Sequence, residues 1–259
     1  MVRFPLRLTA DLALARFAPK SRPAQGAGLV QFVDAAEILH HGSSHPVSHE
    51  RIREINCGRS PVVWIGGSEP LQHPGISHLV RAVTQTGHFV FLETGGTLLR
   101  RRIHEFQPVS RLFLTVRLEP DVRPSASERL RPGVFELAAG GMRAARLSGF
   151  LICVLARVRA ATEPESMVGL IQFAHSADVD GIVITPANGE SDSGNPDAAA
   201  LQQKTAEARK MIGSKWWESF SRIVEPALSS QQSPARNSGE SGVRPAEESR
   251  ADEEGLRIA

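Results

Sequence analysis

The chain has 259 residues, of which 41% are hydrophobic and 22% are charged, and its formal net charge is +2 at pH 7. This composition is ordinary for a globular protein, and the length suits one large α/β domain or two small ones. So small a net charge argues against nucleic acid as a partner. No apolar run reaches the roughly 18 residues of a membrane span, and Asp11 and Arg16 interrupt the N-terminal apolar stretch. We therefore expect a cytoplasmic protein without a signal peptide.

The first 20 residues combine basic and apolar side chains. In a helix, five of the apolar side chains would share roughly one face: Leu8, Leu12, Leu14, Ala15 and Phe17. This pattern predicts a helix that packs on the domain, and we assign residues 1–27 to an N-terminal helical extension. A weak peripheral membrane contact through residues 1–20 is the alternative interpretation.

Six segments with strand patterns follow at rather even intervals: 29–33, 62–65, 89–92, 112–116, 150–155 and 181–185. Most are continuous apolar runs, as expected for strands that are covered on both faces. Helical patterns separate them, and repeated strand–helix alternation indicates a parallel sheet with right-handed crossovers. Six units suit an open (β/α)6 barrel or a doubly wound sheet. We predict the α/β partial TIM barrel, over residues 28–226.

Local signals set the expected ends of the helices: Ser48 as a cap, Pro74 in a first turn, Thr97 as a start, Gly149 as a stop, and a capping box over 162–165. One helix should span 134–147, and the last helical segment should span 197–224 with a break near Gly213. Residues 227–259 are rich in Ser, Gln, Pro, Arg and Glu and lack aromatic residues, which predicts a disordered tail.

Residues 62–74, VVWIGGSEPLQHP, indicate a buried strand that enters a Gly-Gly-Ser turn and is followed by a lone carboxylate, Glu69. Parallel sheets place binding groups beyond the carboxyl ends of their strands. This segment resembles the second strand and the GGEP-type turn of radical S-adenosylmethionine (SAM) enzymes. Three further segments resemble parts of that family: 91–99 its third strand and TNG turn, 114–119 its fourth strand, and 179–186 its sixth strand.

One branch of the family fits best, because residues 3–12 resemble the opening of hopanoid-biosynthesis radical SAM proteins, which attach an adenosyl group to a triterpene. The resemblance implies a (β/α)6 barrel that binds SAM through the turn after the second strand. The residues that it implies for binding SAM are Gly67, Ser68, Glu69, Thr94, Gly95 and Glu119. The alternative reading of Glu69 is a carboxylate that caps local backbone amides.

The family's CxxxCxxC motif, whose three thiolates hold a [4Fe-4S] cluster, is missing. An alignment without gaps puts Asp34, Ile38 and His41 at the three cysteine positions, and an isoleucine cannot bind iron. The chain has two cysteines, Cys57 and Cys153, which lie far apart and form no CxxC pattern. We therefore predict two buried thiols and no [4Fe-4S] cluster.

The leading hypothesis is a divergent radical SAM-like protein without its cluster, which retains SAM or nucleotide binding. It would act as a non-catalytic homologue or accessory partner of a catalytic hopanoid-type paralogue. One alternative is a metal-dependent, non-radical enzyme that uses the loop with His40, His41 and His45, because imidazoles are common metal ligands. Another is an active radical SAM enzyme with atypical cluster ligation. The sequence leaves open whether the chain is an enzyme at all.

Overall fold

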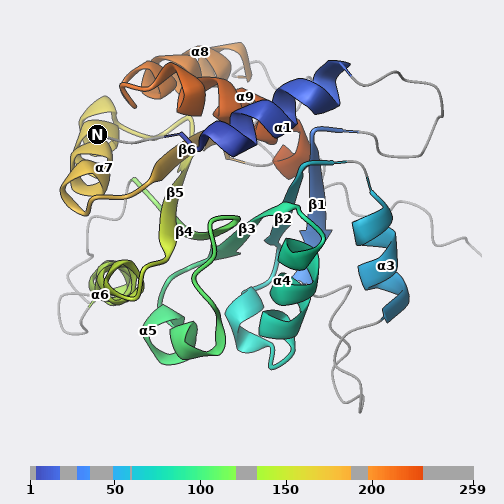
Figure 1. Ribbon diagram of the computed structural model, residues 1–259. Coiled ribbons are helices and arrows are strands. Elements are labelled where there is room, and N and C mark those ends of the chain that lie inside the picture. Colours follow the sequence, from blue (N-terminus) through green and yellow to red (C-terminus); the bar gives the residue numbers. More distant parts are fainter. Residues whose placement is uncertain are drawn as a thin grey trace, which may run out of the picture.

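The computed structural model describes residues 4–17, 28–35, 49–58, 60–120, 133–187 and 198–229, and the structural statements below concern these residues. Six parallel strands form one sheet in the order of the chain: β1 (Val30–Asp34), β2 (Val62–Gly66), β3 (Phe89–Thr94), β4 (Leu112–Leu118), β5 (Leu151–Val158) and β6 (Gly181–Pro186). The sheet curls into a half-barrel with helices outside it (Figure 1). The predicted partial TIM barrel is confirmed.

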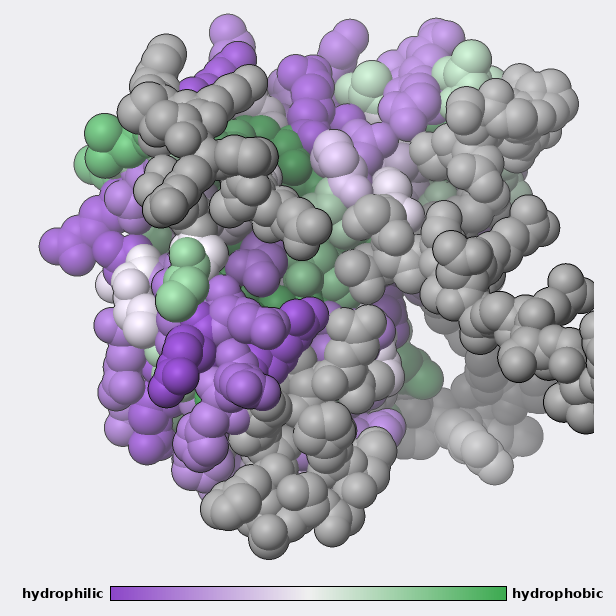
Figure 2. Space-filling model, turned by 90° about the vertical axis from the view of Figure 1, so that its right-hand side faces the viewer, coloured by the Kyte–Doolittle hydropathy of each residue, from purple (hydrophilic) through white to green (hydrophobic). Residues whose placement is uncertain are grey.

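Eight α-helices and two 3-10 turns accompany the described strands: α1 (Leu6–Phe17), α3 (His49–Cys57), η1 (Pro70–Gln72), α4 (Ile76–Gln85), α5 (Leu99–Arg102), η2 (Ile103–Glu105), α6 (Val134–Leu147), α7 (Pro164–Ser176), α8 (Ala198–Lys210) and α9 (Lys215–Ser229). Helices cover the outer face of the sheet, which explains why every residue of β2, β3 and β6 is buried. On the side that carries α3, the described surface is largely hydrophilic (Figure 2).

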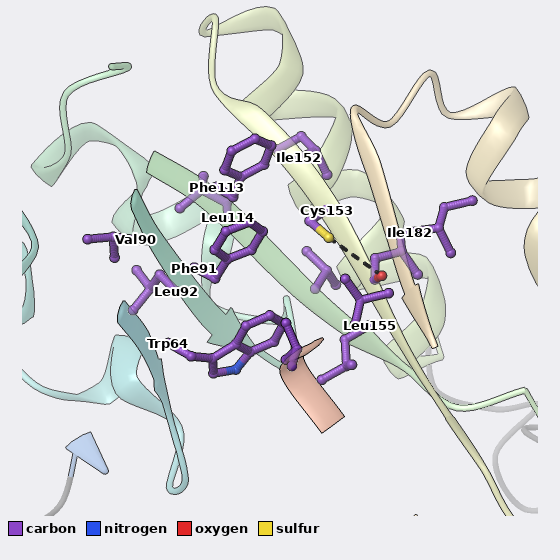
Figure 3. Close-up of a cluster of buried hydrophobic side chains, with 14 of the residues drawn as sticks. Trp64, Val90, Phe91, Leu92, Phe113, Leu114, Ile152, Cys153, Leu155 and Ile182 are labelled. Carbon is purple, nitrogen blue, oxygen red and sulfur yellow. Dashed lines mark hydrogen bonds between the residues drawn. The ribbon is translucent and has the colours of Figure 1, made fainter. Parts of the chain in front are cut away.

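The inner face of the sheet is filled by aromatic rings. Trp64, Phe91 and Phe113 are register partners on β2, β3 and β4, so their side chains point to the same side. The rings stack in parallel, with centroids 5.2 Å apart for Trp64 and Phe91 and 4.7 Å apart for Phe91 and Phe113 (Figure 3). The interior of the barrel before the carboxyl ends of the strands is therefore a packed core.

Helix α9 completes this core from the open side of the half-barrel, between β6 and β1. The Phe220 ring lies 5.0 Å from Phe91, and the Trp217 ring lies 6.0 Å from Phe113. Trp217 fits only because β6 begins with Gly181: a Cβ at that position would collide with the indole ring. Trp217 and Phe220 are thus buried in the core, whereas Trp216 stays more than half exposed.

The outer edge of β6 is covered by side chains of the last two helices. The backbone N–H of Ile184 donates to Ser221 Oγ at 3.1 Å, and Arg209 Nε donates to the Ile184 carbonyl at 2.9 Å. Arg209 also forms a buried ion pair with Glu225 at 2.7 Å. These contacts pair the polar groups of the strand edge with α8 and α9 and block its use by another strand.

Three of the predicted helix starts are wrong, each for a local reason. Pro74 lies before α4, which begins at Ile76, because η1 and the bond from Gly75 N to His73 Nδ1 occupy the turn. The helix expected at Thr97 is only the short α5 followed by η2. The capping box is absent: Glu163 is the cap residue of α7, and Thr162 Oγ1 instead accepts from Arg159 N at 2.9 Å.

The predictions of a helix over 134–147 and of a break near Gly213 hold, whereas Ser48, the predicted cap of α3, lies outside the described residues. Helix α6 runs unbroken to Leu147, and Gly149 after it adopts a φ of +84°. Gly141 lies where α6 meets α5, and a Cβ there would come within 2.9 Å of the Gly96 carbonyl. Helix α9 continues to Ser229, three residues into the expected tail, and residues 230–259 lie outside the described part.

Helix α1 packs across the end of the barrel where α8 and α9 lie (Figure 1). Leu8 and Leu12 are buried, but Leu14 is 70% exposed, so its predicted place on the packed face is wrong. The reason is that Leu14 follows Leu12 by two positions, which places it on the opposite side of the helix from the buried residues. No described helix is long and apolar enough to cross a membrane.

We predict that Ser221→Ala destabilises the domain by about 1–3 kcal/mol, because it leaves the buried Ile184 N–H without its acceptor. Urea unfolding followed by circular dichroism measures the change. Ser219→Ala is the matched control, because Ser219 is exposed on the same helix and should lose less than about 0.5 kcal/mol. Equal losses in the two variants would contradict the edge-covering role of Ser221.

Candidate functional site

The carboxyl ends of the first three strands meet at a turn rich in glycine. Strand β2 ends at Gly66, and Gly67 follows it with a φ of +84°, a conformation that side-chain-bearing residues rarely adopt. Ser68 is exposed. Glu69 is the cap residue of η1 and is half-buried at the mouth of the barrel. The expected position of Glu69 beyond a strand end is confirmed.

Glu69 joins the ends of β2 and β3. Its carboxylate accepts from Thr94 Oγ1 at 2.6 Å, from Gly95 N at 2.7 Å and more weakly from Leu71 N at 3.3 Å. Thr94 Oγ1 in turn accepts from Gly96 N at 3.0 Å. The structure thus brings three of the predicted site residues together, Glu69, Thr94 and Gly95, in the capping arrangement that was the alternative reading.

This capping leaves some of the carboxylate's capacity unused. An ionised carboxylate offers about four lone-pair positions, and three donors of the described residues occupy the Glu69 oxygens. Glu69 therefore keeps one acceptor position and its negative charge for a ligand. A cationic donor such as an ammonium group would form a charge-assisted hydrogen bond there.

Two more carboxylates lie against the glycine turn. A Cβ at Gly67 would collide with the Asp34 carboxylate, and a Cβ at Gly66 would come within 3.0 Å of Glu93 Oε2. The paired glycines therefore do more than form a tight turn: they leave room for one carboxylate on each side of the backbone. Any side chain at Gly67 would meet both the strained φ and the collision with Asp34.

Glu93 is the most buried charge at the mouth, with 2% of its surface exposed. Its carboxylate accepts from Trp64 Nε1 at 2.9 Å, from Arg117 Nη1 at 2.9 Å and from Arg157 Nη2 at 3.1 Å. Four strands, β2 to β5, supply these four side chains, so the network ties the barrel mouth together. We call these four residues the mouth network.

The mouth network was not predicted from the sequence, although a signal for it exists. Each strand from β3 to β5 is mostly apolar and carries a charged residue as its last but one: Glu93, Arg117 and Arg157. A charge in such a position needs a buried partner, so three of them on neighbouring parallel strands could have predicted an ion-pair cluster.

The remaining predicted site residues do not join Glu69. Glu119 forms an ion pair with Arg159 at 2.9 Å, and both side chains are well exposed. Asp34, which was expected in the loop after the first strand, is the last residue of β1, and its carboxylate lies beside Gly67. Ile38 and the loop with His40, His41 and His45 lie outside the described residues.

Two further residues serve the turn itself. His73 is buried and accepts from Gly75 N at 3.0 Å. Arg102 donates to the carbonyls of Leu71 and His73 at 2.8 and 3.1 Å. This guanidinium therefore binds the backbone after Glu69.

The two cysteines do not fit a [4Fe-4S] cluster. Cys153 is buried in the middle of β5, where burial raises the pKa of its thiol well above the usual value. Cys57 is exposed on α3, so the prediction of two buried thiols is wrong for Cys57, because only Ile55 of that helix is buried. Two separate thiols cannot bind three irons. Among the described residues, no group of three His, Cys, Asp or Glu side chains could hold a metal ion.

Comparison with known proteins gives a match of fold. No family model and no curated protein matches the sequence. The crystal structure of Streptococcus suis SuiB bound to its precursor peptide SuiA matches with a TM-score of 0.50 and 13% identity, over 72% of this chain and 47% of that one. SuiB bound to S-adenosylmethionine gives a TM-score of 0.47 at 13% identity, over 71% and 44%. Archaeal TYW1 gives 0.41 at 16% identity, over 63% and 55%.

SuiB and TYW1 are radical SAM enzymes. The likeness to the SuiB–SuiA structure shows that this chain shares a partial-barrel fold with that protein, and it shows the fold alone. The chain spans about half the length of the solved proteins that it matches.

We predict that one thiol per native chain reacts rapidly with a disulfide reagent near neutral pH. Exposed Cys57 should react, whereas Cys153 should stay protonated and inaccessible, since thiolate is the reacting form. Ellman titration of native protein measures this, and denatured protein should show two thiols. Cys57→Ser should abolish the native reaction, and a persisting fast phase in that variant would contradict the burial of Cys153.

Proposed function

We propose that this chain is a radical SAM-like domain without the [4Fe-4S] cluster that binds SAM at the barrel mouth and performs no radical chemistry. The observation that carries the proposal is the Glu69 carboxylate, held by Thr94 and Gly95 at the strand ends with an acceptor position unused. The two cysteines support the lack of a [4Fe-4S] cluster, because neither lies at the mouth with a second thiol.

The ligand fits the charges of this part of the mouth. The SAM ammonium would lie at Glu69, and the backbone of Gly67 and Ser68, which lies between β2 and Glu69, would border it. Glu69 and its partners Thr94 and Gly95 hold the site in shape without any cluster.

Calorimetric titration with SAM tests the proposal. We expect native protein to bind SAM, and Glu69→Gln to weaken binding at least tenfold, because about 1.4 kcal/mol corresponds to a factor of ten and a charge-assisted hydrogen bond contributes that much. Glu165→Gln, an exposed change of equal charge on α7, is the control and should bind as native protein does. Absence of binding in native protein, or unchanged binding in Glu69→Gln, would contradict the site.

The proposed biological role is that of an accessory protein or non-catalytic homologue beside a catalytic radical SAM paralogue of the hopanoid type. The N-terminal segment 3–12 supports the branch, and the mismatch between two cysteines and a three-thiolate motif supports the lack of catalysis. Anaerobic reconstitution with iron and sulfide tests the alternative of an active enzyme with atypical cluster ligation. If the reconstituted protein shows neither cluster absorbance nor 5′-deoxyadenosine formation, that alternative is wrong. Elemental analysis of His41→Ala against native protein tests the alternative metal enzyme of the histidine loop.

We also propose that α1 contacts an anionic lipid surface. Its outward face is apolar: Leu6 is 86% exposed and Leu14 is 70% exposed, and Ala10 and Ala13 lie between them. Exposed Arg7 and Arg16 flank this face, as in helices that lie in the membrane interface.

We predict that the protein floats with vesicles that contain phosphatidylserine and that added salt weakens the binding, since salt screens the arginines. The double variant Leu6→Glu/Leu14→Glu should lower the vesicle-bound fraction several-fold. Leu147→Glu is the control, because Leu147 is 85% exposed on α6, away from α1. Equal binding of both variants would rule out α1 as the contact.

A further inference from the structure

We infer that the turn between α8 and α9 inserts into an anionic lipid surface and docks the barrel so that its mouth faces away from the bilayer. The inserting side chains are Met211 and Trp216, and Lys210 and Lys215 flank them. The inference rests on the proposed function for the part of the docking surface that α1 supplies, whereas the turn is argued from its own side chains.

Two large apolar side chains project from this turn. Met211 is 42% exposed and Trp216 is 58% exposed, although their neighbours Ile212 and Trp217 are buried. Single apolar side chains on a surface are normal, but an exposed indole beside an exposed thioether in one short turn is an apolar tip. Tryptophan is typical of the membrane interface, because its ring is apolar and its N–H can remain hydrated.

The Trp216 ring is held in place by the start of the chain. It stacks on Phe4, with ring centroids 6.1 Å apart and 20° between the planes, and Phe4 meets Trp217 edge-on at 4.9 Å. Phe4 comes two residues before α1 begins at Leu6. The exposed indole is therefore fixed in position beside the helix that is already proposed to contact lipid, and little ordering is needed when it inserts.

The charges of the turn favour an anionic surface. Lys210 is the last residue of α8 and Lys215 is the first residue of α9, and both are exposed. Of the acids within one helical turn of them, Glu218 pairs with Arg222, and Glu207 is hydrogen-bonded within α8. Lysines that flank an apolar tip can lay their aliphatic stems along the lipid boundary while their ammonium groups meet anionic headgroups.

Helix α1 and this turn lie at the end of the barrel opposite the mouth. Asp11 of α1 accepts from Arg111, which directly precedes β4, and Trp217 packs on Gly181, the first residue of β6. Both contacts are therefore at amino ends of strands. Figure 1 shows α1, α8 and α9 gathered at the end from which the arrow of β1 points away. A barrel docked through this end opens toward water, so a ligand of the mouth must come from the aqueous side.

The tryptophans provide a direct reporter, because Trp64 and Trp217 are buried and Trp216 is exposed. Native protein is mixed with vesicles that contain phosphatidylserine and either ordinary phosphatidylcholine or phosphatidylcholine brominated in its acyl chains. We expect a blue shift of the emission on binding. Bromine should quench most of the emission that Trp216→Phe lacks relative to native protein, and it should leave the emission of Trp216→Phe unchanged.

Matched variants test the turn and the orientation. Met211→Glu/Trp216→Glu should lower the vesicle-bound fraction several-fold, and Lys210→Gln/Lys215→Gln should lower it and weaken its dependence on salt. Val134→Glu is the control, because Val134 is 66% exposed where α6 begins after β4, on the mouth side. A bimane fluorophore on Ser68→Cys, in a Cys57→Ser background, reports the mouth, and brominated lipid should not quench it.

The outcomes separate this inference from the proposed function. Vesicle binding with unquenched Trp216 supports the α1 contact and overturns the inserting turn. Quenching of Trp216 that persists in Leu6→Glu/Leu14→Glu supports the turn and contradicts the α1 contact. Quenching of the bimane at position 68 overturns the orientation. Absence of vesicle binding in native protein, with a dimer in light scattering that Met211→Glu/Trp216→Glu dissociates, assigns the turn to a second copy of the chain and overturns the inference.

Discussion

A sheet that curls without closing leaves an open side, and the aromatic core that fills this opening is the constraint on which the fold depends. Trp217 and Phe220 of α9 enter between β6 and β1 and meet the rings of the strands. Ser221 and Arg209 then pair with the backbone of β6. Because these contacts come from the last helices, the half-barrel is completed only when the end of the chain packs onto its beginning.

The same core separates two parts of the barrel: an apolar interior and a charged mouth at the carboxyl ends of the strands. Trp64 lies at the boundary, since its ring stacks on Phe91 while its N–H donates to Glu93. Burying the Glu93 carboxylate costs several kcal/mol unless it is paired, and the two arginines provide that pairing. Removing either arginine alone should therefore loosen the mouth as well as alter its charge.

The strands were predictable because continuous apolar runs are a local signal, and every predicted strand segment lies in or within one residue of an observed one. The helix starts were harder, because the turn at Pro74 depends on His73 and Arg102, whose partners are set by the folded loop. Leu14 was misplaced since periodicity shows that a helix has an apolar face but not how much of it a neighbour covers. The mouth network escaped because its pairs span 24 to 64 residues.

The Glu69 turn shows how one carboxylate at a strand end can serve the fold as well as a ligand. Its oxygens join two strand ends through Thr94 and Gly95, so the residue contributes to the fold whether or not a ligand binds. Arg117 and Arg157 are tied to the fold in the same way, because they pair the buried Glu93 carboxylate of β3 with β4 and β5. The charged side chains at the mouth therefore hold neighbouring strand ends together, and a variant that alters ligand binding there must also be compared with native protein for its stability.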